Sequence, residues 1–236
     1  MNKPVGNILR ALALLGMAVA AHADILVLYD FGTVEAPTFA SADNDPHSTA
    51  THFSVNPTVM GVTGTTSSST NWLNTGDGNP APEFAQKPRG GADQAQAYAN
   101  NAYWTFTIAP DADVTLSLQS LTFDLSIKNS GRPISYYLAS SLSGFDIPIG
   151  SVANNVTGPS AYTTRTFDLS GAEFQDITAE VEFRLYQWDQ NLGGSAGSRW
   201  GFDNIVLNGT SVVIPEPASL ALLAAGGLWL LTRRRG

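Results

Sequence analysis

The sequence predicts an all-β fold, an antiparallel β-sandwich or jelly roll, over residues 24–211. Short segments alternate between apolar and polar residues with the period of two that half-buried strands require. Gly, Asn, Asp, Ser and Pro separate these segments at short intervals, and no stretch between residues 24 and 210 has the period of an amphipathic helix. Many short strands at regular spacing are typical of sandwiches and jelly rolls.

The predicted strands begin with the apolar run ILVLYDF at 25–31, which suits a strand buried on both faces. The segment AYWTFTI at 102–108 alternates, with its tryptophan, phenylalanine and isoleucine on one face. The segment VTLSLQSLTFDLSI at 114–127 alternates twice and changes phase at Gln119-Ser120, so we expect a bulge or a tight corner there.

Four further segments have strand character: 134–141, 161–171, 179–188 and 199–209. The region 56–100 is rich in Gly, Pro and small polar residues, and we expect a long loop with one or two short strands.

The composition of the predicted body excludes several classes of function. Residues 24–214 contain 19 Asp and Glu against 7 Lys and Arg. This acidic balance argues against nucleic acid as a partner, because nucleic acids bind surfaces rich in Lys and Arg. The sequence has no cysteine, which excludes thiol nucleophiles, thiolate metal sites and disulfides.

The N-terminal segment 1–23 predicts a signal peptide for export. Lys3 and Arg10 are followed by an apolar run that ends at Ala21, and Ala21-His22-Ala23 has the small-x-small form that signal peptidase cleaves, here after Ala23. The alternative is a membrane anchor, but the apolar run is shorter than the ~20 residues that a spanning helix needs.

The C-terminal segment 212–236 predicts a short transmembrane helix. Residues 217–231 carry no charge and would span about 22 Å as a helix, against a hydrocarbon core of about 30 Å. A cluster of three arginines follows and resists crossing the membrane, so residues 24–214 lie outside. The cluster consists of Arg233, Arg234 and Arg235.

The motif Pro215-Glu216-Pro217, followed by an apolar helix and an arginine cluster, resembles the PEP-CTERM sorting signal of Gram-negative bacteria. The resemblance implies an inner-membrane-anchored precursor, recognition and cleavage by an exosortase, and delivery to the cell surface or the extracellular space, often in bacteria that form exopolysaccharide. The two prolines keep the backbone extended and accessible to a processing enzyme. A plain tail anchor behind a proline linker is the alternative.

The order of segments in the body also resembles PEP-CTERM ectodomains. YDFGT, SLTFDLSI, YYLASSLSGF, VEFRLYQW and FDNIVLNG occur in that order before the sorting signal. The resemblance implies a sandwich similar to concanavalin-like or carbohydrate-binding jelly rolls, and says more about fold than about activity.

The sequence offers little for catalysis. His47 and His52 are five residues apart, and no serine-hydrolase elbow or zincin motif occurs. Glu180 and Glu182 share a strand face at a spacing of about 7 Å, as a glycosidase pair would. Arg184 follows on that face, which favours an ordinary solvated surface. We therefore predict no catalytic residues.

Loop carboxylates give candidates for a calcium site, and the sequence predicts no other cofactor. Hard oxygen ligands suit Ca²⁺, although such residues also build turns. The candidates are Asp43, Asp45, Asp77 and Asp203. Asp203 alternates with apolar residues, so its carboxylate needs backbone N–H groups or a cation as a partner.

Exposed aromatic rings bind glycans by stacking on sugar rings. Trp72 lies in the polar loop, and Tyr186 and Trp188 share the polar face of their strand with Glu182 and Arg184. The alternative is that these rings cover the core or pack under a loop.

The sequence therefore predicts an exported, non-catalytic protein of the cell surface or extracellular matrix. Its processing partners would be signal peptidase and an exosortase, and its ligand would be a polysaccharide. A glycan-active enzyme of concanavalin-like fold and a purely structural envelope protein are the alternatives.

Overall fold

The computed structural model describes residues 24–33, 36, 38–43, 45–55, 73–74, 83–86, 91–128, 134–155, 162–189 and 199–214. The predicted signal peptide with Ala21 and Ala23 lies outside these residues. So do the sorting motif Pro215, Glu216 and Pro217 and the arginines at 233–235.

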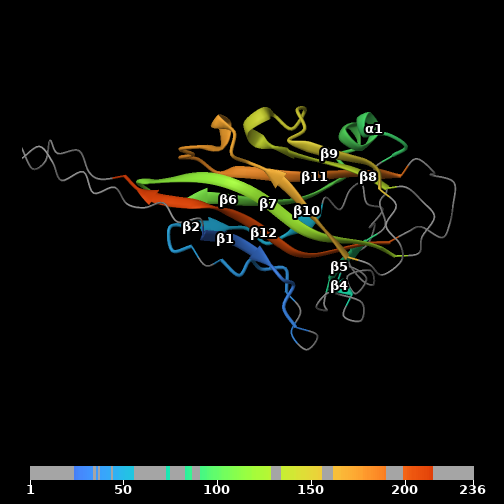
Figure 1. Ribbon diagram of the computed structural model, residues 1–236, viewed down its shortest axis with the longest axis horizontal. Helices are drawn as coiled ribbons and strands as arrows, with labels where there is room; N and C mark the ends of the chain where they lie inside the picture. Colours follow the sequence, from blue (N-terminus) through green and yellow to red (C-terminus); the bar gives the residue numbers. More distant parts are fainter. Residues whose placement is uncertain are drawn as a thin grey trace, which may run out of the picture.

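The described strands form two six-stranded antiparallel sheets that pack face to face (Figure 1). Sheet I has the order β10-β7-β12-β5-β4, and β1 also pairs with β12. Its strands are β1 (Asp24–Tyr29), β4 (Leu73–Asn74), β5 (Glu83–Gln86), β7 (Val114–Lys128), β10 (Tyr162–Asp168) and β12 (Arg199–Val213).

Sheet II has the order β2-β6-β11-β8-β9, and β3 also pairs with β6. Its strands are β2 (Ser48–Ala50), β3 (Ser54–Val55), β6 (Tyr103–Pro110), β8 (Ile134–Ser140), β9 (Gly150–Asn155) and β11 (Val181–Asp189). The prediction of an antiparallel β-sandwich is confirmed for the described part of the chain.

The core lies between the sheets, where alternate side chains of each strand meet. Trp104, Phe106 and Ile108 of β6 are all buried, as their shared face predicts. The ring centroids of Trp104 and Phe202 of β12 lie 3.8 Å apart in an edge-to-face arrangement, which joins sheet II to sheet I. Burial of such large rings is the main term that holds a sandwich together.

The change of phase at Gln119-Ser120 is a β-bulge. Asn208 pairs with Ser120 and Gly209 pairs with Leu118, so Gln119 is the extra residue on β7. The bulge keeps both halves of β7 facing the core. Gly209 is required there, because a Cβ at this position would lie 2.6 Å from the carbonyl oxygen of Ser117.

The short strands β2 and β3, the helix α1 and the strand β9 were not predicted. The α-helix α1 (Gln94–Ala99) lies where the sequence predicts no helical element, and it is too short, at 6 residues, to show a helical period. It begins at Asp93, whose carboxylate accepts a hydrogen bond from the Gln96 N–H at 2.8 Å. The strand β9 follows the short 3₁₀ turn η2 (Ser141–Ser143), and its residues GSVANN do not alternate.

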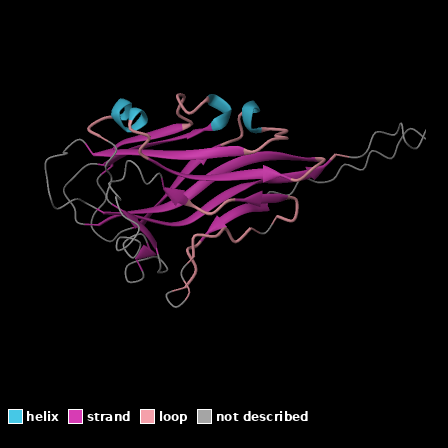
Figure 2. Ribbon diagram, turned by 180° about the vertical axis from the view of Figure 1, so that it is seen from behind, coloured by secondary structure: helices cyan, strands magenta, loops and turns pink. Residues whose placement is uncertain are grey.

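Figure 2 shows that the helical segments lie outside the two sheets, on one side of the sandwich. α1 and η2 both contact β11 of sheet II, whereas a second 3₁₀ turn, η3 (Ala172–Phe174), contacts β7. Within the described residues, no helix is long and apolar enough to cross a membrane. The predicted transmembrane segment 217–231 lies outside them.

Candidate functional site

The outer face of sheet II carries a second aromatic cluster, separate from the core. We call it the outer cluster; its buried members are Ala97, Tyr137, Ala139, Tyr186 and Trp188, and Tyr103 and Phe145 pack against them. On β11, Phe183 and Leu185 face the core, so Tyr186 and Trp188 face outward near α1.

The prediction that Tyr186 and Trp188 are exposed glycan-stacking rings is wrong. They are only 1% and 6% exposed, because α1 and the neighbouring rings cover them. Tyr186 stacks on Tyr137 of β8 with ring centroids 4.7 Å apart and planes at 11°. The two rings lie opposite each other on adjacent strands, and such cross-strand pairs stabilise a sheet. Both rings are instead packed beneath α1 on the outer face of the sheet.

Beside the outer cluster lies a small open pocket of about 310 Å³. It is lined by Gln94, Ala95, Tyr98, Tyr137 and Asp146. Tyr98 of α1 is 41% exposed, and its ring lies 5.6 Å from that of Tyr186. The pocket therefore combines an exposed ring, an amide and a carboxylate, and the outer cluster forms its base.

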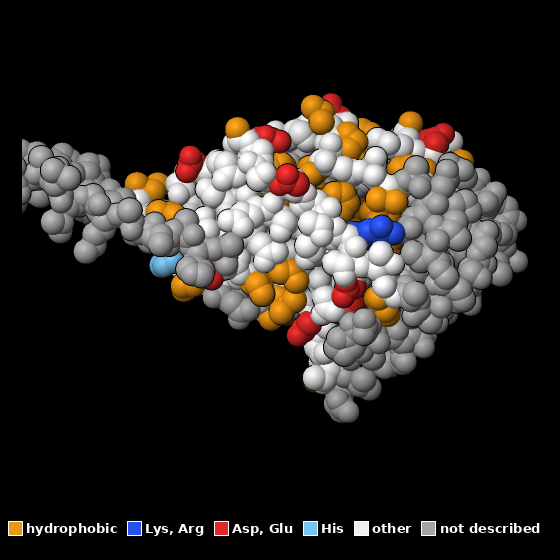
Figure 3. All heavy atoms as spheres, in the orientation of Figure 1, with side chains coloured by type: hydrophobic (Ala, Val, Ile, Leu, Met, Phe, Trp, Pro, Cys, Tyr) orange, Lys and Arg blue, Asp and Glu red, His pale blue; other side chains and the backbone are white. Residues whose placement is uncertain are grey.

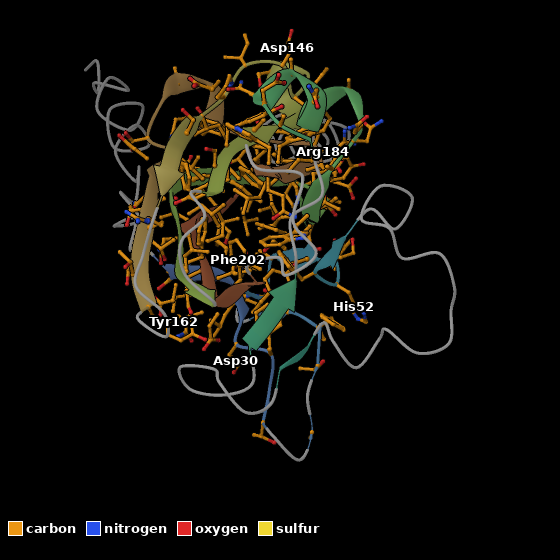
Figure 4. All side chains as sticks on the ribbon, turned by 90° about the vertical axis from the view of Figure 1, so that its right-hand side faces the viewer. Asp30, His52, Asp146, Tyr162, Arg184 and Phe202 are labelled. Carbon is orange, nitrogen blue, oxygen red and sulfur yellow. The ribbon has the colours of Figure 1, made fainter. Side chains whose placement is uncertain are left out.

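Asp146 comes from the loop between η2 and β9, and Arg184 of β11 holds this loop on the sheet. The guanidinium carbon of Arg184 lies 3.7 Å from the ring centroid of Phe145 and 4.3 Å from that of Tyr103. Cations bind aromatic faces at such distances. Figure 4 shows Arg184 and Asp146 at the outer face, near α1, with Phe202 deep between the sheets.

A bidentate ion pair orients the guanidinium of Arg184. Its Nε and Nη2 donate to the two carboxylate oxygens of Glu182 at 2.7 and 3.0 Å. Partial burial works to lower the pKa of Arg184, but the hydrogen bonds to Glu182 and Tyr186 outweigh it and the pKa is raised. Arg184 therefore keeps its charge at every working pH.

The loop backbone is strained where it meets Arg184. Gly144 and Phe145 have φ angles of 71° and 70°, in the left-handed region that a bulky side chain rarely adopts. Such a conformation costs about 1–3 kcal/mol and persists where the surroundings impose it. Here the stacking of Phe145 on Arg184 offsets that cost and fixes the residue that precedes Asp146.

Tyr137 supplies a neutral phenol at the base of the pocket. Burial raises its pKa, and the neighbouring Tyr186, Tyr98 and Asp146 raise it further. The hydroxyl therefore stays protonated, and a protonated phenol can both donate and accept a hydrogen bond.

The two glutamates considered as a catalytic pair are bound to their own sheet. Glu180 accepts a hydrogen bond from the Thr107 hydroxyl at 3.2 Å. Glu182 accepts one from the Thr105 hydroxyl at 2.8 Å and is paired with Arg184. His47 and His52 lie in loops on either side of β2. The glutamate and arginine side chains on this face therefore bind the neighbouring strand and one another.

The calcium candidates are dispersed over the fold. Asp43 accepts the Asp45 N–H at 3.1 Å, and Asp45 accepts the Ser211 hydroxyl at 2.7 Å, so both organise a loop. Asp203 is fully buried on β12 and accepts the Asn204 N–H at 2.8 Å. Asp77 lies outside the described residues, as does Trp72. Among the described residues, no three His, Asp or Glu side chains gather closely enough to hold a metal ion.

Sequence reasoning missed Tyr98, Tyr103, Tyr137 and Asp146. The adjacent tyrosines of ISYYLAS could have indicated one ring on each face of β8. The helix that carries Tyr98 is too short to show a period, and Asp146 lies in a loop whose position only the folded chain determines.

No family model and no curated protein matches this chain. Among solved structures, the K3 adhesin domain of Lys-gingipain from Porphyromonas gingivalis is 14% identical, with 55% of this chain and 75% of that chain covered and a TM-score of 0.32. The K1 adhesin domain of the same protein is 12% identical, with 79% and 96% covered and a TM-score of 0.32.

A further similar structure is TmCBM61 in complex with β-1,4-galactotriose, at 13% identity, with 70% of this chain and 83% of that chain covered and a TM-score of 0.30. TM-scores of this size do not establish a shared function, so the function of this chain follows from its own residues.

Proposed function

We propose that this chain is a non-catalytic, glycan-binding β-sandwich whose binding site is the pocket between Tyr98, Tyr137 and Asp146. One observation carries the proposal: a single pocket of about 310 Å³ contains an exposed ring, a carboxylate and an amide. The exposed ring is that of Tyr98, which is 41% accessible. Ligand pockets begin at about 300 Å³, so this one suits a single sugar unit rather than a long chain.

The chemistry of the lining fits a neutral sugar. A pyranose offers an apolar face to the Tyr98 ring and hydroxyl groups at its edge. Asp146 accepts hydrogen bonds from hydroxyls, and the Gln94 amide both donates and accepts them. A carboxylate in the pocket disfavours an acidic sugar, because like charges repel.

The same lining favours binding over hydrolysis. A glycosidase needs two carboxyl groups on either side of the scissile bond. Asp146 is the one carboxylate among the residues that line the pocket. Glu180 and Glu182 are held by Thr107 and Arg184 on the sheet surface.

We propose further that the protein is exported, processed by an exosortase at Pro215-Glu216-Pro217, and delivered to the cell surface or matrix. The sorting pattern in the sequence supports this, together with the N-terminal segment that precedes Ala23. Replacing Glu216 with alanine should leave the protein uncleaved, as read from the mass of the mature chain. An unchanged mass would refute the sorting role.

A glycan array tests the binding function. We expect neutral glycans to bind the purified domain and binding to fall about fivefold or more in Tyr98→Ala, because stacking on an aromatic ring contributes on the order of 1 kcal/mol or more. Tyr162→Ala removes a ring from β10 of the other sheet and is the matched control. Equal binding by wild type and Tyr98→Ala, or an array with no bound glycan, would refute the proposal.

A further inference from the structure

The carboxylate of the candidate pocket is not used by the fold. Asp146 is exposed and lines the hollow together with Tyr98 and Tyr137. Within the described part of the chain, no group donates a hydrogen bond to this carboxylate or forms an ion pair with it. Burial raises the pKa of the Tyr137 phenol, and the charge of Asp146 is among the influences that raise it further, so this charge reaches the base of the pocket. Asp146 therefore offers a negative charge to a ligand.

The arginine on this face does not neutralise Asp146. Both carboxylate oxygens of Glu182 accept hydrogen bonds from the Arg184 guanidinium, which also stacks on the ring of Phe145. Asp93 caps α1 and adds a second negative charge next to the lining that α1 contributes to the pocket. The electrostatic potential at the pocket is therefore negative.

The surface around the pocket belongs to an acidic body. Residues 24–214 contain 19 Asp and Glu against 7 Lys and Arg. Figure 3 shows several acidic side chains along the upper edge of the molecule, the side on which Figure 1 places α1, whereas the Lys and Arg side chains visible on this face form one patch below. A field of this sign raises the local concentration of cations and repels anions. The pocket therefore favours a ligand with a positive charge.

The exposed ring of the pocket can bind a cation as well as a sugar. The Tyr98 ring is held against that of Tyr186, with the centroids 5.6 Å apart, and remains accessible to solvent. The face of a tyrosine ring attracts a cation through its quadrupole, and the same face packs against the apolar side of a pyranose. A protonated amino sugar has both features, a pyranose face and an ammonium group at its edge.

We propose that the pocket selects an amino sugar with a free, protonated amine, with the ammonium group on Asp146 and the sugar ring on Tyr98. This inference rests on the proposed glycan-binding function and names the class of sugar that the same pocket prefers. An ammonium group forms charge-assisted hydrogen bonds with a carboxylate, and these are stronger than the bonds that a hydroxyl forms. A neutral sugar keeps the stacking contact and loses this gain, whereas a linear oligocation keeps the charge and lacks the pyranose face.

Calorimetric titration of the purified protein with matched tetrasaccharides tests the proposal. The β-1,4-linked glucosamine tetramer carries amines, its N-acetylated form keeps the nitrogen without the charge, and cellotetraose has hydroxyls in their place. At a mildly acidic pH, which keeps the amines protonated, we expect the glucosamine tetramer to bind about fivefold or more tightly than either neutral tetramer. This preference should shrink as the salt concentration rises, because salt screens exposed charges.

Failure of this inference can be told apart from failure of the proposed function. Equal affinity for all the tetramers would overturn the preference for an amine and leave glycan binding in place. Absence of binding by the glucosamine tetramer would also overturn it, whereas the array of neutral glycans decides the function itself. Tetralysine, an oligomer of similar charge, should bind more weakly than the glucosamine tetramer. Equal binding of the two would show that charge alone is recognised and would contradict the proposal.

Variants of the lining assign the preference to the pocket. Asp146→Asn keeps the size of the side chain and loses its charge, so binding of the glucosamine tetramer should fall about fivefold while binding of the neutral tetramers changes little. Tyr98→Ala removes the ring and should weaken binding of all the tetramers. Unfolding midpoints of the variants control for damage to the fold.

Asp113→Asn is the matched control for the loss of charge. Asp113 is exposed in the turn after β6, at the opposite end of that strand from Tyr103, and its φ of 61° suits asparagine. This variant makes the same change in net charge and should keep the preference for the amine. A preference that survives in Asp146→Asn, or that is lost equally in Asp113→Asn, would contradict the assignment to the pocket.

Discussion

The two faces of sheet II carry aromatic clusters that are covered by different parts of the chain. Trp104 points into the core while its neighbour Tyr103 points to the outer cluster, and Tyr136 and Tyr137 divide in the same way. Core rings such as Trp104 meet the opposing sheet and are closed off from solvent. Among the described residues, a six-residue helix and a loop cover the outer cluster, and Tyr98 is exposed at its margin.

The difference shows how one strand pattern can serve stability and binding together. Alternation sends every second ring outward, and such rings need a further covering segment to bury them. Among the described residues, α1 and the loop after η2 provide this cover. The uncovered part is the pocket, and the partly buried Arg184 fixes one of its walls.

Removing a core ring should have the largest effect. Trp104→Ala leaves a cavity beside Phe202 and should destabilise the protein by about 3–5 kcal/mol, measured by chemical denaturation. Trp188→Ala in the outer cluster should destabilise it less, because the neighbouring helix can settle into the space. Equal losses in the two variants would contradict the distinction between a closed and an open cluster.

Loosening the pocket loop should have an intermediate effect on stability. Arg184→Gln removes the contacts with Phe145 and Tyr103 and should cost about 1–2 kcal/mol, since each cation–π contact contributes about 0.5–1 kcal/mol or more. It should also raise amide exchange in the loop at Asp146 while leaving β6 protected. A variant with wild-type exchange in this loop would show that Arg184 does not position it.

The smallest effect is expected at a loop carboxylate outside both clusters. Burial raises the pKa of Asp43, despite hydrogen bonds that lower it, so its stabilising contribution belongs to the protonated form. That contribution is present below the ordinary carboxyl pKa and is lost as the pH rises through the raised value.

Asp43→Asn should therefore stabilise the protein slightly at pH 7, by no more than about 0.5 kcal/mol, and should lose this advantage in acid. Thermal melts of the variant and of wild type across the pH range measure this difference in stability. If the variant is less stable than wild type at pH 7, the claim that folding disfavours the charged form of Asp43 is contradicted.

The fold could be predicted from the sequence because alternation is a local signal. The faces of β6, β7 and β11 follow from their period of two, and so does the bulge at Gln119. Which outward face is covered depends on segments far away in the chain. The prediction of exposed rings at Tyr186 and Trp188 failed because α1 approaches them from Gln94–Ala99.

The candidate site was harder to predict for the same reason. Tyr98, Tyr137 and Asp146 come from a helix, a strand and a loop, and no spacing in the sequence joins them. Asp146 depends on the left-handed backbone at Gly144 and Phe145, which Arg184 supports from another strand. Contacts of this kind arise only when the chain folds.

Amide hydrogen exchange with and without a bound neutral glycan tests the central claim most directly. We predict new protection in α1 and in the loop around Asp146, with no change in β10 or in the core strands. Protection confined to another surface, or an exchange pattern that saturating glycan leaves unaltered, would contradict the claim that the open side of the outer cluster is a sugar-binding site.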